Sequence, residues 1–132
     1  MSMFKKTNEE FVHEVELLSG QNLFSCYQCG KCSAGCAFAN FMDMLPHQVI
    51  RFLQLKKVEP VIDANTYWYC AACLTCTTRC PKSVDLASIM EALRNIMIRE
   101  NRPYIQVFSL PVEIIEGFPQ QAAVSALRKL SG

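Results

Sequence analysis

The sequence has little charge, and the charge it has is balanced. Charged residues make up 19% of the 132 positions and give a formal net charge of +1. A protein that binds nucleic acid by releasing counterions needs a strong basic excess, so this class is excluded. Intrinsic disorder is excluded as well, because 51% of the residues are hydrophobic.

Long apolar runs are also missing. No stretch approaches the roughly 18 apolar residues of a membrane-spanning helix, because polar or charged residues interrupt each one. The first ten residues, MSMFKKTNEE, contain no apolar stretch of signal-peptide length. We therefore expect a cytoplasmic protein with one modest core. Its high hydrophobic content then indicates apolar surface that is covered by a binding partner or a bound group and not by a membrane.

Cysteine, by contrast, is abundant, and its spacing repeats. Because thiols stay reduced in the cytoplasm, eight cysteines point to metal binding and not to structural disulfides. All eight fall into two runs with the spacing C-x2-C-x2-C-x3-C: Cys26, Cys29, Cys32 and Cys36, and then Cys70, Cys73, Cys76 and Cys80. This is the bacterial-type run that ligates 4Fe–4S clusters.

The spacing also predicts which thiolates share a cluster. Three cysteines two residues apart can wrap one face of a cube, and in two-cluster ferredoxins the fourth ligates the other cluster. We therefore expect one cluster on Cys26, Cys29, Cys32 and Cys80, and the other on Cys70, Cys73, Cys76 and Cys36. Close approach of Gly30 and Gly35 would let backbone N–H groups reach the sulfurs.

Two other uses of these cysteines compete with this interpretation. Four thiolates can also hold zinc, but zinc sites usually pair two C-x2-C units across a longer gap. Redox-active or structural disulfides are the second alternative. Cluster ligation accounts for the doubled spacing better than either of them.

The rest of the sequence predicts helices. A capping box at Thr7–Glu10 starts one that stops at Gly20. Pro46 begins a second, which ends near residues 56–57, before a turn-rich connection over 58–69. Ser83 or Asp85 caps a third, whose apolar stripe consists of Leu86, Ile89, Met90, Leu93, Ile96 and Met97. Pro119 starts a last one, and residues 104–108 give a weak strand signal.

Three segments go beyond spacing and resemble one family, the C subunit of heterodisulfide reductase. They are residues 26–36 (CYQCGKCSAGC), residues 45–55 (LPHQVIRFLQL) and residues 67–81 (YWYCAACLTCTTRCP). The resemblance covers about residues 20–102. It departs from the family at Ala37, where proline is usual, and residues 103–132 carry no motif of the family.

The resemblance implies an all-α protein of the α-helical ferredoxin fold with two 4Fe–4S clusters. We divide the chain into an N-terminal helical extension (1–21), a dicluster domain (22–102) and a C-terminal partner-docking tail (103–132), the last because its apolar residues are expected to be buried against partner subunits. The resemblance also implies an electron conduit between an A subunit with flavin and iron–sulfur groups and a cysteine-rich B subunit that reduces disulfides.

Single residues near the runs have two interpretations each. Lys31, Arg79 and Lys82 either stabilise a reduced cluster or are solvated surface charges. Tyr27, Tyr67, Trp68 and Tyr69 either guide electrons and contact partners or shield the clusters and fill the core. His13 and His47 are expected at the surface or in the core, since the cysteines already complete both ligand sets.

No nucleophile–base pair, paired carboxylates or phosphate loop is present, so we expect electron transfer without catalysis of bond chemistry. The preferred hypothesis is an electron-transfer subunit of a heterodisulfide-reductase-like complex. A free, diffusible dicluster ferredoxin is the first alternative, although such carriers tend to be acidic. A zinc-stabilised interaction module is the second.

Overall fold

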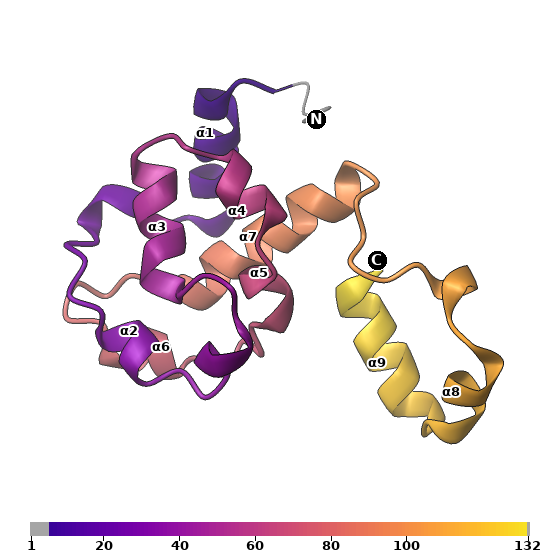
Figure 1. Ribbon diagram of the computed structural model, residues 1–132. Helices are drawn as coiled ribbons and strands as arrows, with labels where there is room; N and C mark the ends of the chain where they lie inside the picture. Colours follow the sequence, from indigo (N-terminus) through magenta and orange to yellow (C-terminus); the bar gives the residue numbers. More distant parts are fainter. Residues whose placement is uncertain (1–5, 132) are drawn as a thin grey trace. The chain divides into compact units, whose positions relative to one another are not determined.

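The computed structural model describes residues 6–131 and confirms the all-α prediction, since these residues form helices, turns and loops but no strand. Figure 1 shows the helices in chain order. They divide into two units, residues 1–93 and 94–132, and the boundary falls within α7. The helical segments of the first unit are α1 (Asn8–Ser19), η1 (Leu23–Ser25), α2 (Lys31–Ala34), η2 (Ala39–Phe41), α3 (Pro46–Gln54), α4 (Glu59–Asp63), α5 (Thr66–Tyr69), α6 (Thr75–Arg79) and most of α7 (Leu86–Arg99).

The predicted ends of the first long helix are confirmed. Thr7 accepts a hydrogen bond from the Glu10 N–H, and the Glu10 carboxylate accepts one from the Thr7 N–H, which completes the capping box. Gly20 ends α1 in the left-handed conformation at φ 65°. Pro46 starts α3 at its first position, as predicted, but α3 ends at Gln54, slightly earlier than expected.

The connection before the second cysteine run is more helical than predicted. Residues 58–69 contain α4 and α5, separated by only two residues. The Asp43 carboxylate and the Asn65 side chain exchange hydrogen bonds with each other's backbone N–H groups, and Thr66 donates to the Met44 carbonyl at 2.6 Å. Contacts between distant segments therefore stabilise two turns of helix that are too short to be stable alone.

The core of the first unit comes from α1, α3, α4, α5 and α7. The members of the predicted apolar stripe of α7 that belong to this unit, Leu86, Ile89, Met90 and Leu93, are buried, and Ile96 and Met97, which belong to the second unit, are buried as well. Asp85 is the cap of α7, because its carboxylate accepts hydrogen bonds from the Ser88 N–H and hydroxyl. The Ser88 hydrogen bonds outweigh the opposing effect of burial, so the pKa of Asp85 is lowered.

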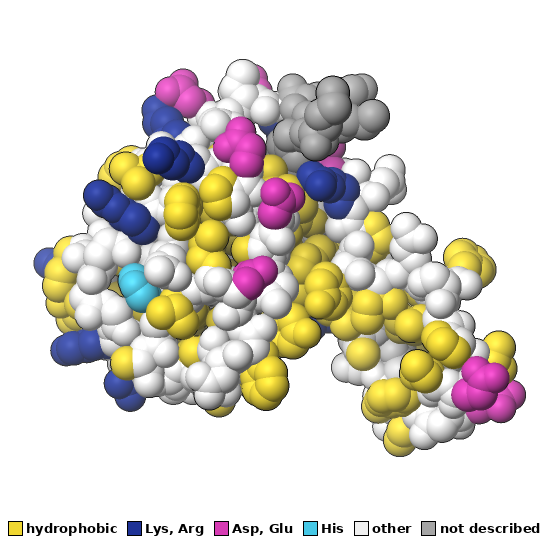
Figure 2. Space-filling model, viewed as in Figure 1, with side chains coloured by type: hydrophobic (Ala, Val, Ile, Leu, Met, Phe, Trp, Pro, Cys, Tyr) yellow, Lys and Arg dark blue, Asp and Glu magenta, His cyan; other side chains and the backbone are white. Residues whose placement is uncertain are grey.

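The second unit continues from the end of α7 through η3 (Val107–Ser109), α8 (Val112–Gly117) and α9 (Gln120–Leu130). α9 begins after Pro119, as predicted, whereas η3 replaces the weak strand signal and α8 was not expected. The backbone N–H groups of Tyr104 and Ile105 both donate to the Leu130 carbonyl, which closes the unit on itself. Many hydrophobic side chains remain on its surface (Figure 2), and Phe108 is fully exposed.

None of the helices in the described part of the chain is long and apolar enough to cross a membrane.

Candidate iron–sulfur site

Each cysteine run follows the same backbone path. Around the second cysteine of each run, the residue before it and the residue after it have a positive φ: Gln28 and Gly30 in the first run, Ala72 and Leu74 in the second. Left-handed conformations are unusual for residues with a Cβ, so three of these four positions store strain. Alternation of right- and left-handed residues turns successive N–H groups toward a common concavity that favours an anion. The doubled sequence motif is therefore also a doubled backbone motif.

The third cysteine of each run begins or lies in a short helix, and these two helices, α2 and α6, pack against each other. The Arg79 side chain of α6 crosses this contact, and its Nε donates to the Lys31 carbonyl at 3.0 Å. Gly35 makes room for it, because a Cβ at this position would lie 2.5 Å from Arg79 Nε. Gly30, by contrast, has open space around it, so its positive φ is the reason for glycine there.

The first-run pocket is lined by Cys26, Cys29, Cys32 and Cys80. Cys76 of the second run also belongs to this lining, so the pocket holds three thiols of the first run and two of the second. The hollow has about 350 Å³ of empty volume, and its other walls include His47, Ile50, Val84 and Leu86. The Gln28 amide donates to Cys26 Sγ at 3.3 Å, and the Val84 N–H donates to Cys80 Sγ at 3.4 Å.

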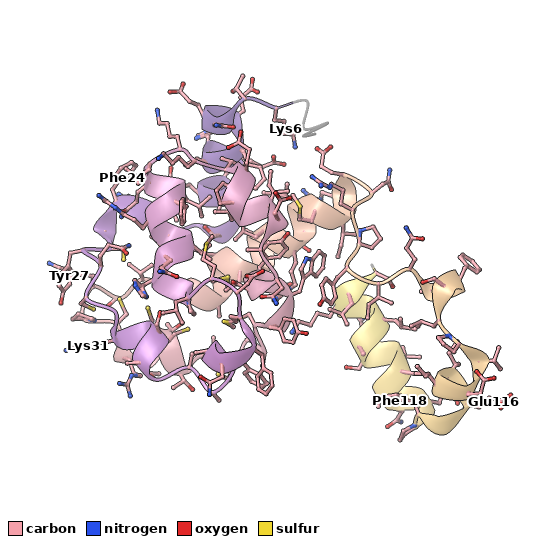
Figure 3. The ribbon with its side chains drawn as sticks, in the orientation of Figure 1. Lys6, Phe24, Tyr27, Lys31, Glu116 and Phe118 are labelled. Carbon is pink, nitrogen blue, oxygen red and sulfur yellow. The ribbon has the colours of Figure 1, made fainter. Side chains whose placement is uncertain are left out.

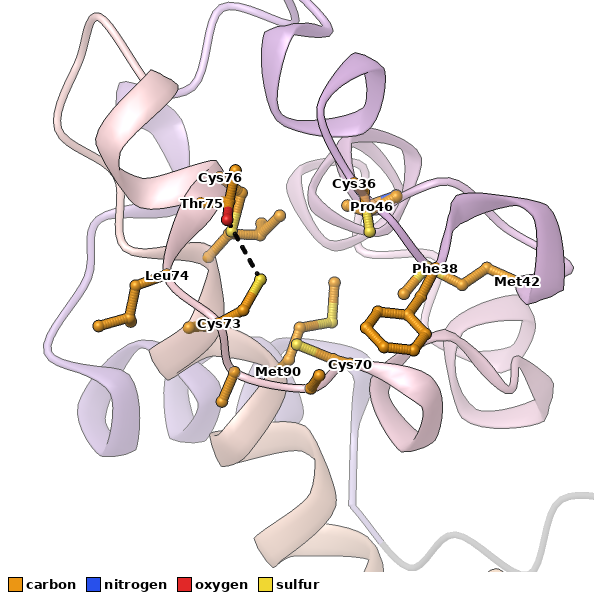
Figure 4. A pocket seen from close by; sticks show the side chains of 14 residues that line it. Cys36, Phe38, Met42, Pro46, Cys70, Cys73, Leu74, Thr75, Cys76 and Met90 are labelled. Atoms are coloured by element: carbon orange, nitrogen blue, oxygen red, sulfur yellow. Dashed lines mark hydrogen bonds between the residues drawn. The ribbon is translucent and has the colours of Figure 1, made fainter.

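The second-run pocket is lined by Cys70, Cys73, Cys76 and Cys36 (Figure 4). It has about 430 Å³ of empty volume. The Cys73 thiol donates to Thr75 Oγ1 at 3.4 Å, drawn as the dashed line in the figure. Its remaining walls are mainly apolar and consist of Phe38, Met42, Pro46, Ala71, Ala72, Leu74, Leu86, Ala87 and Met90.

Two residues line both pockets. Cys76 and the buried Leu86 belong to the wall of each, so the two hollows are neighbours across the start of α7 and the α6 helix. This proximity suits electron hopping between groups bound in the two pockets.

The donor set fits iron–sulfur clusters. None of the eight cysteines forms a disulfide. Burial raises the pKa of the inner thiols Cys32 and Cys76, so their thiolates need the positive charge of a metal. The hydrogen bond with Thr75 lowers the pKa of the exposed Cys73 thiol. Within residues 6–131, no group of three or more His, Cys, Asp or Glu side chains converges tightly enough to hold one metal ion. Thiols spread around a hollow fit a polynuclear cluster better than tetrahedral zinc.

The aromatic residues divide between core and surface. Tyr67 and Trp68 are buried, and Tyr67 donates to the Ile62 carbonyl at 2.7 Å, so they fill the core. Tyr27 is 56% exposed and lies with Lys31 at one edge of the first unit (Figure 3). The Lys82 ammonium lies 5.8 Å from the Tyr27 ring centroid. Local desolvation and then a hydrogen bond with the Cys29 side chain raise the pKa of Tyr27.

The cysteine spacing does not indicate several other residues that lie around the pockets. His47 contributes to the first-run pocket, and its Nδ1 lies 2.6 Å from Ser33 Oγ, whose oxygen also accepts the His47 N–H. Ser33 is buried and lies 3.9 Å from Cys32 Sγ. Sequence reasoning placed His47 in the surface or core without a role. The left-handed Leu74 could have been predicted, because it occupies the place in its run that Gly30 has in the first.

Comparison with known proteins agrees with this geometry. Residues 22–84 match the 4Fe-4S dicluster domain family. The chain is 34% identical over 99 residues to an iron–sulfur C subunit of the CoB–CoM heterodisulfide reductase of Methanocaldococcus jannaschii, a match that covers 69% of this chain and 53% of the relative. It is 35% identical over 92 residues to the corresponding iron–sulfur C subunit of Methanopyrus kandleri, covering 70% and 46%.

A longer alignment reaches the C subunit of the H(2):CoB-CoM heterodisulfide,ferredoxin reductase of Methanothermobacter marburgensis, with 27% identity over 128 residues, 95% of this chain and 69% of the relative. The chain spans about half the length of the first two relatives. Residues 22–84 are thus similar to the 4Fe–4S dicluster domain, and the chain is similar to iron–sulfur C subunits of heterodisulfide reductases.

Proposed function

We propose that this protein is the electron-transfer subunit of a heterodisulfide-reductase-like complex, with one 4Fe–4S cluster in each pocket. The observation that carries the proposal is the composition of the pockets. The second-run pocket combines three thiols of its run with Cys36 of the first, and the first-run pocket combines three thiols of its run with Cys80 and Cys76 of the second. A cluster in each pocket supplies one-electron redox chemistry. The chain's own residues provide the thiolates, exclude water with apolar walls and keep the two sites close together.

In the first-run pocket, the proposed ligands are Cys26, Cys29, Cys32 and Cys80, and in the second-run pocket they are Cys70, Cys73, Cys76 and Cys36. This exchange joins the two halves of the first unit. With all eight thiols engaged, no free thiol remains for bond chemistry. We therefore assign the chain a carrier role and not a catalytic one.

The ligand exchange can be tested with four matched variants. Cys29→Ser and Cys73→Ser each remove a thiol that lines the pocket of its own run. Cys80→Ser and Cys36→Ser remove the two exchanged thiols. After anaerobic reconstitution, the native chain should bind about eight irons and eight sulfides. The EPR spectrum of Cys80→Ser should match that of Cys29→Ser, and the spectrum of Cys36→Ser should match that of Cys73→Ser. The opposite pairing would refute the exchange, and bound zinc without sulfide would refute the clusters.

We propose that the partners are an A subunit with flavin and iron–sulfur groups and a cysteine-rich, disulfide-reducing B subunit. The support is that several relatives are named as C subunits of heterodisulfide reductases. Affinity purification of the chain from its native source should recover both partners. Recovery of a small monomer alone would favour the free ferredoxin instead.

We further propose that residues 103–132 dock on such a partner protein. Large apolar side chains are exposed over this segment, among them Phe108, Val112, Ile114 and Phe118. The pair of substitutions Phe108→Ser and Phe118→Ser should abolish co-purification of the partner while leaving the iron content unchanged. Glu113→Gln, on α8 between the two substituted positions in the sequence, is the control. Undiminished co-purification of the double variant would refute this role.

A further inference from the structure

The two pockets share a backbone path but differ in the charge around them. The segments that form the first-run pocket, residues 26–32 and 80–86, carry Lys31, Lys82 and one acidic residue, Asp85, whose carboxylate accepts hydrogen bonds from Ser88 and Thr77. The segments that form the second-run pocket, residues 36–46 and 70–76, carry one acidic residue, Asp43, and no Lys or Arg. The formal charges of these segments are therefore +1 and −1.

The two lysines of the first-run segments are exposed and stand next to cysteines of this pocket in the sequence. Lys82 follows the proposed ligand Cys80 by two residues, and its ammonium lies 5.8 Å from the ring centroid of Tyr27, which stands between Cys26 and Cys29. Lys31 lies between Cys29 and Cys32, and its carbonyl holds Arg79 of the neighbouring helix. Figure 2 shows Lys and Arg side chains along the edge where Figure 3 labels Tyr27 and Lys31.

A neutral donor adds to this charge. The Gln28 amide reaches Cys26 Sγ at 3.3 Å, and its left-handed backbone, at φ 64°, directs the side chain back over the run. The residue at the same place in the second run is Ala72, which has no donor. In the second-run pocket the Thr75 hydroxyl lies 3.4 Å from Cys73 Sγ, and the walls otherwise present apolar side chains such as Phe38, Met42 and Met90. Gln28 thus gives the first-run pocket an N–H donor to a cysteine sulfur.

We infer that the first-run pocket has the higher reduction potential and that electrons within the chain come to rest there. The inference rests on the proposed function. Adding an electron makes a site more negative, so nearby cations and N–H donors to sulfur stabilise the reduced form, whereas apolar walls do not. One electron then moves from the second-run pocket to the first; no proton moves, and no bond forms or breaks. The face with Tyr27 and Cys29 is where the electron leaves.

The test is an EPR-monitored redox titration of the reconstituted full chain. Two one-electron waves are expected. Cys29→Ser should remove or distort the higher wave, and Cys73→Ser the lower one. These two substitutions show which wave belongs to which pocket. The assignment does not depend on the ligand exchange, because each of these cysteines lines the pocket of its own run. Iron and sulfide analysis shows separately whether the pockets hold clusters, so a failure of the proposed function is recognised on its own.

Gln28→Met then tests the donor, because methionine has a similar length but no N–H. Loss of this hydrogen bond should lower the equilibrium constant for reduction of the first-run site by about threefold to tenfold. A tenfold change corresponds to about 59 mV in a one-electron couple. Lys82→Gln should lower the same wave by a smaller factor, roughly up to threefold, because its charge is partly screened. Gln121→Met, on exposed α9, is the matched control and should leave both waves in place.

A downward shift of the higher wave in Gln28→Met and Lys82→Gln supports the inference. The inference is overturned if Cys29→Ser removes the lower wave, if the two waves coincide, or if neither wave responds to Gln28→Met and Lys82→Gln.

Discussion

Substitution of Gly35 by alanine should destabilise the protein, because the new methyl group would collide with the side chain of Arg79, which is 44 positions away in the sequence. A Cβ at residue 35 would lie 2.5 Å from Arg79 Nε, 2.6 Å from Cδ and 2.8 Å from Cζ. These atoms belong to a flexible side chain, so Arg79 can move aside. It would then lose the hydrogen bond from Nε to the Lys31 carbonyl. That bond is worth about 0.5–1.5 kcal/mol, and residual crowding adds to the loss.

The sign of the effect should reverse when Arg79 is absent. Gly35 has an ordinary φ of −99°, which alanine adopts without strain. In an Arg79→Ala background, Gly35→Ala should therefore stabilise the protein by about 0.4–1 kcal/mol, because alanine restricts the unfolded chain. The coupling free energy of this double-mutant cycle is then expected to be about 1–2.5 kcal/mol.

The assay is anaerobic thermal unfolding of the reconstituted protein, followed by circular dichroism at a fixed heating rate. A change of about 1 kcal/mol should shift the melting temperature by roughly 4 °C in a chain of this size. Iron content is measured on each variant, so that loss of cofactor is separated from loss of packing. Equal effects of Gly35→Ala in the two backgrounds would show that Arg79 does not occupy the space of the missing Cβ.

Three further substitutions test the local structure in the same assay. Leu74→Gly should stabilise the protein by about 1 kcal/mol, because it relieves a left-handed conformation of an exposed leucine at φ 62°, whereas Leu74→Ala should not. Asp85→Ala should cost about 1–2 kcal/mol, since it removes the cap that accepts two hydrogen bonds from Ser88; an unchanged melting temperature would exclude the cap. Tyr67→Phe should cost roughly 1 kcal/mol through the unpaired Ile62 carbonyl, and a stabilising effect would contradict this.

The sequence predicted the long helices well, because each has its own local signals. α1 has a capping box and a glycine stop, α3 begins with proline, and α7 buries every residue of its predicted stripe. Spacing alone does not decide burial in α1, because Leu18 has the helical spacing of the core residues Phe11 and Val15 but is 40% exposed. Spacing predicts a face, whereas the width of the buried face depends on what packs against it.

The short helices could not be predicted in the same way. α2, α4, α5 and α6 have four or five residues each, which is below the length at which helical periodicity is visible. Their stability comes from tertiary contacts such as those of Asp43 with Asn65 and of Arg79 with Lys31. The spacing rule predicts which cysteines share a cluster, and this stays a prediction; the donors around the cysteines, such as Gln28, become visible only in three dimensions.

The doubled backbone limits where a difference between the two sites can originate. Each residue of the first run has a counterpart 44 positions later, and the left-handed positions coincide, so backbone N–H groups contribute similarly to both. A difference in potential can therefore come from side chains and from backbone donors outside the runs, such as the Val84 N–H on Cys80 Sγ, and Gln28 opposite Ala72 is the most direct side-chain contrast. Exchange of these two residues, Gln28→Ala with Ala72→Gln, should narrow the separation between the two redox waves, because the donor then serves the second-run pocket. An unchanged separation would place the asymmetry in the charges of Lys31 and Lys82 instead.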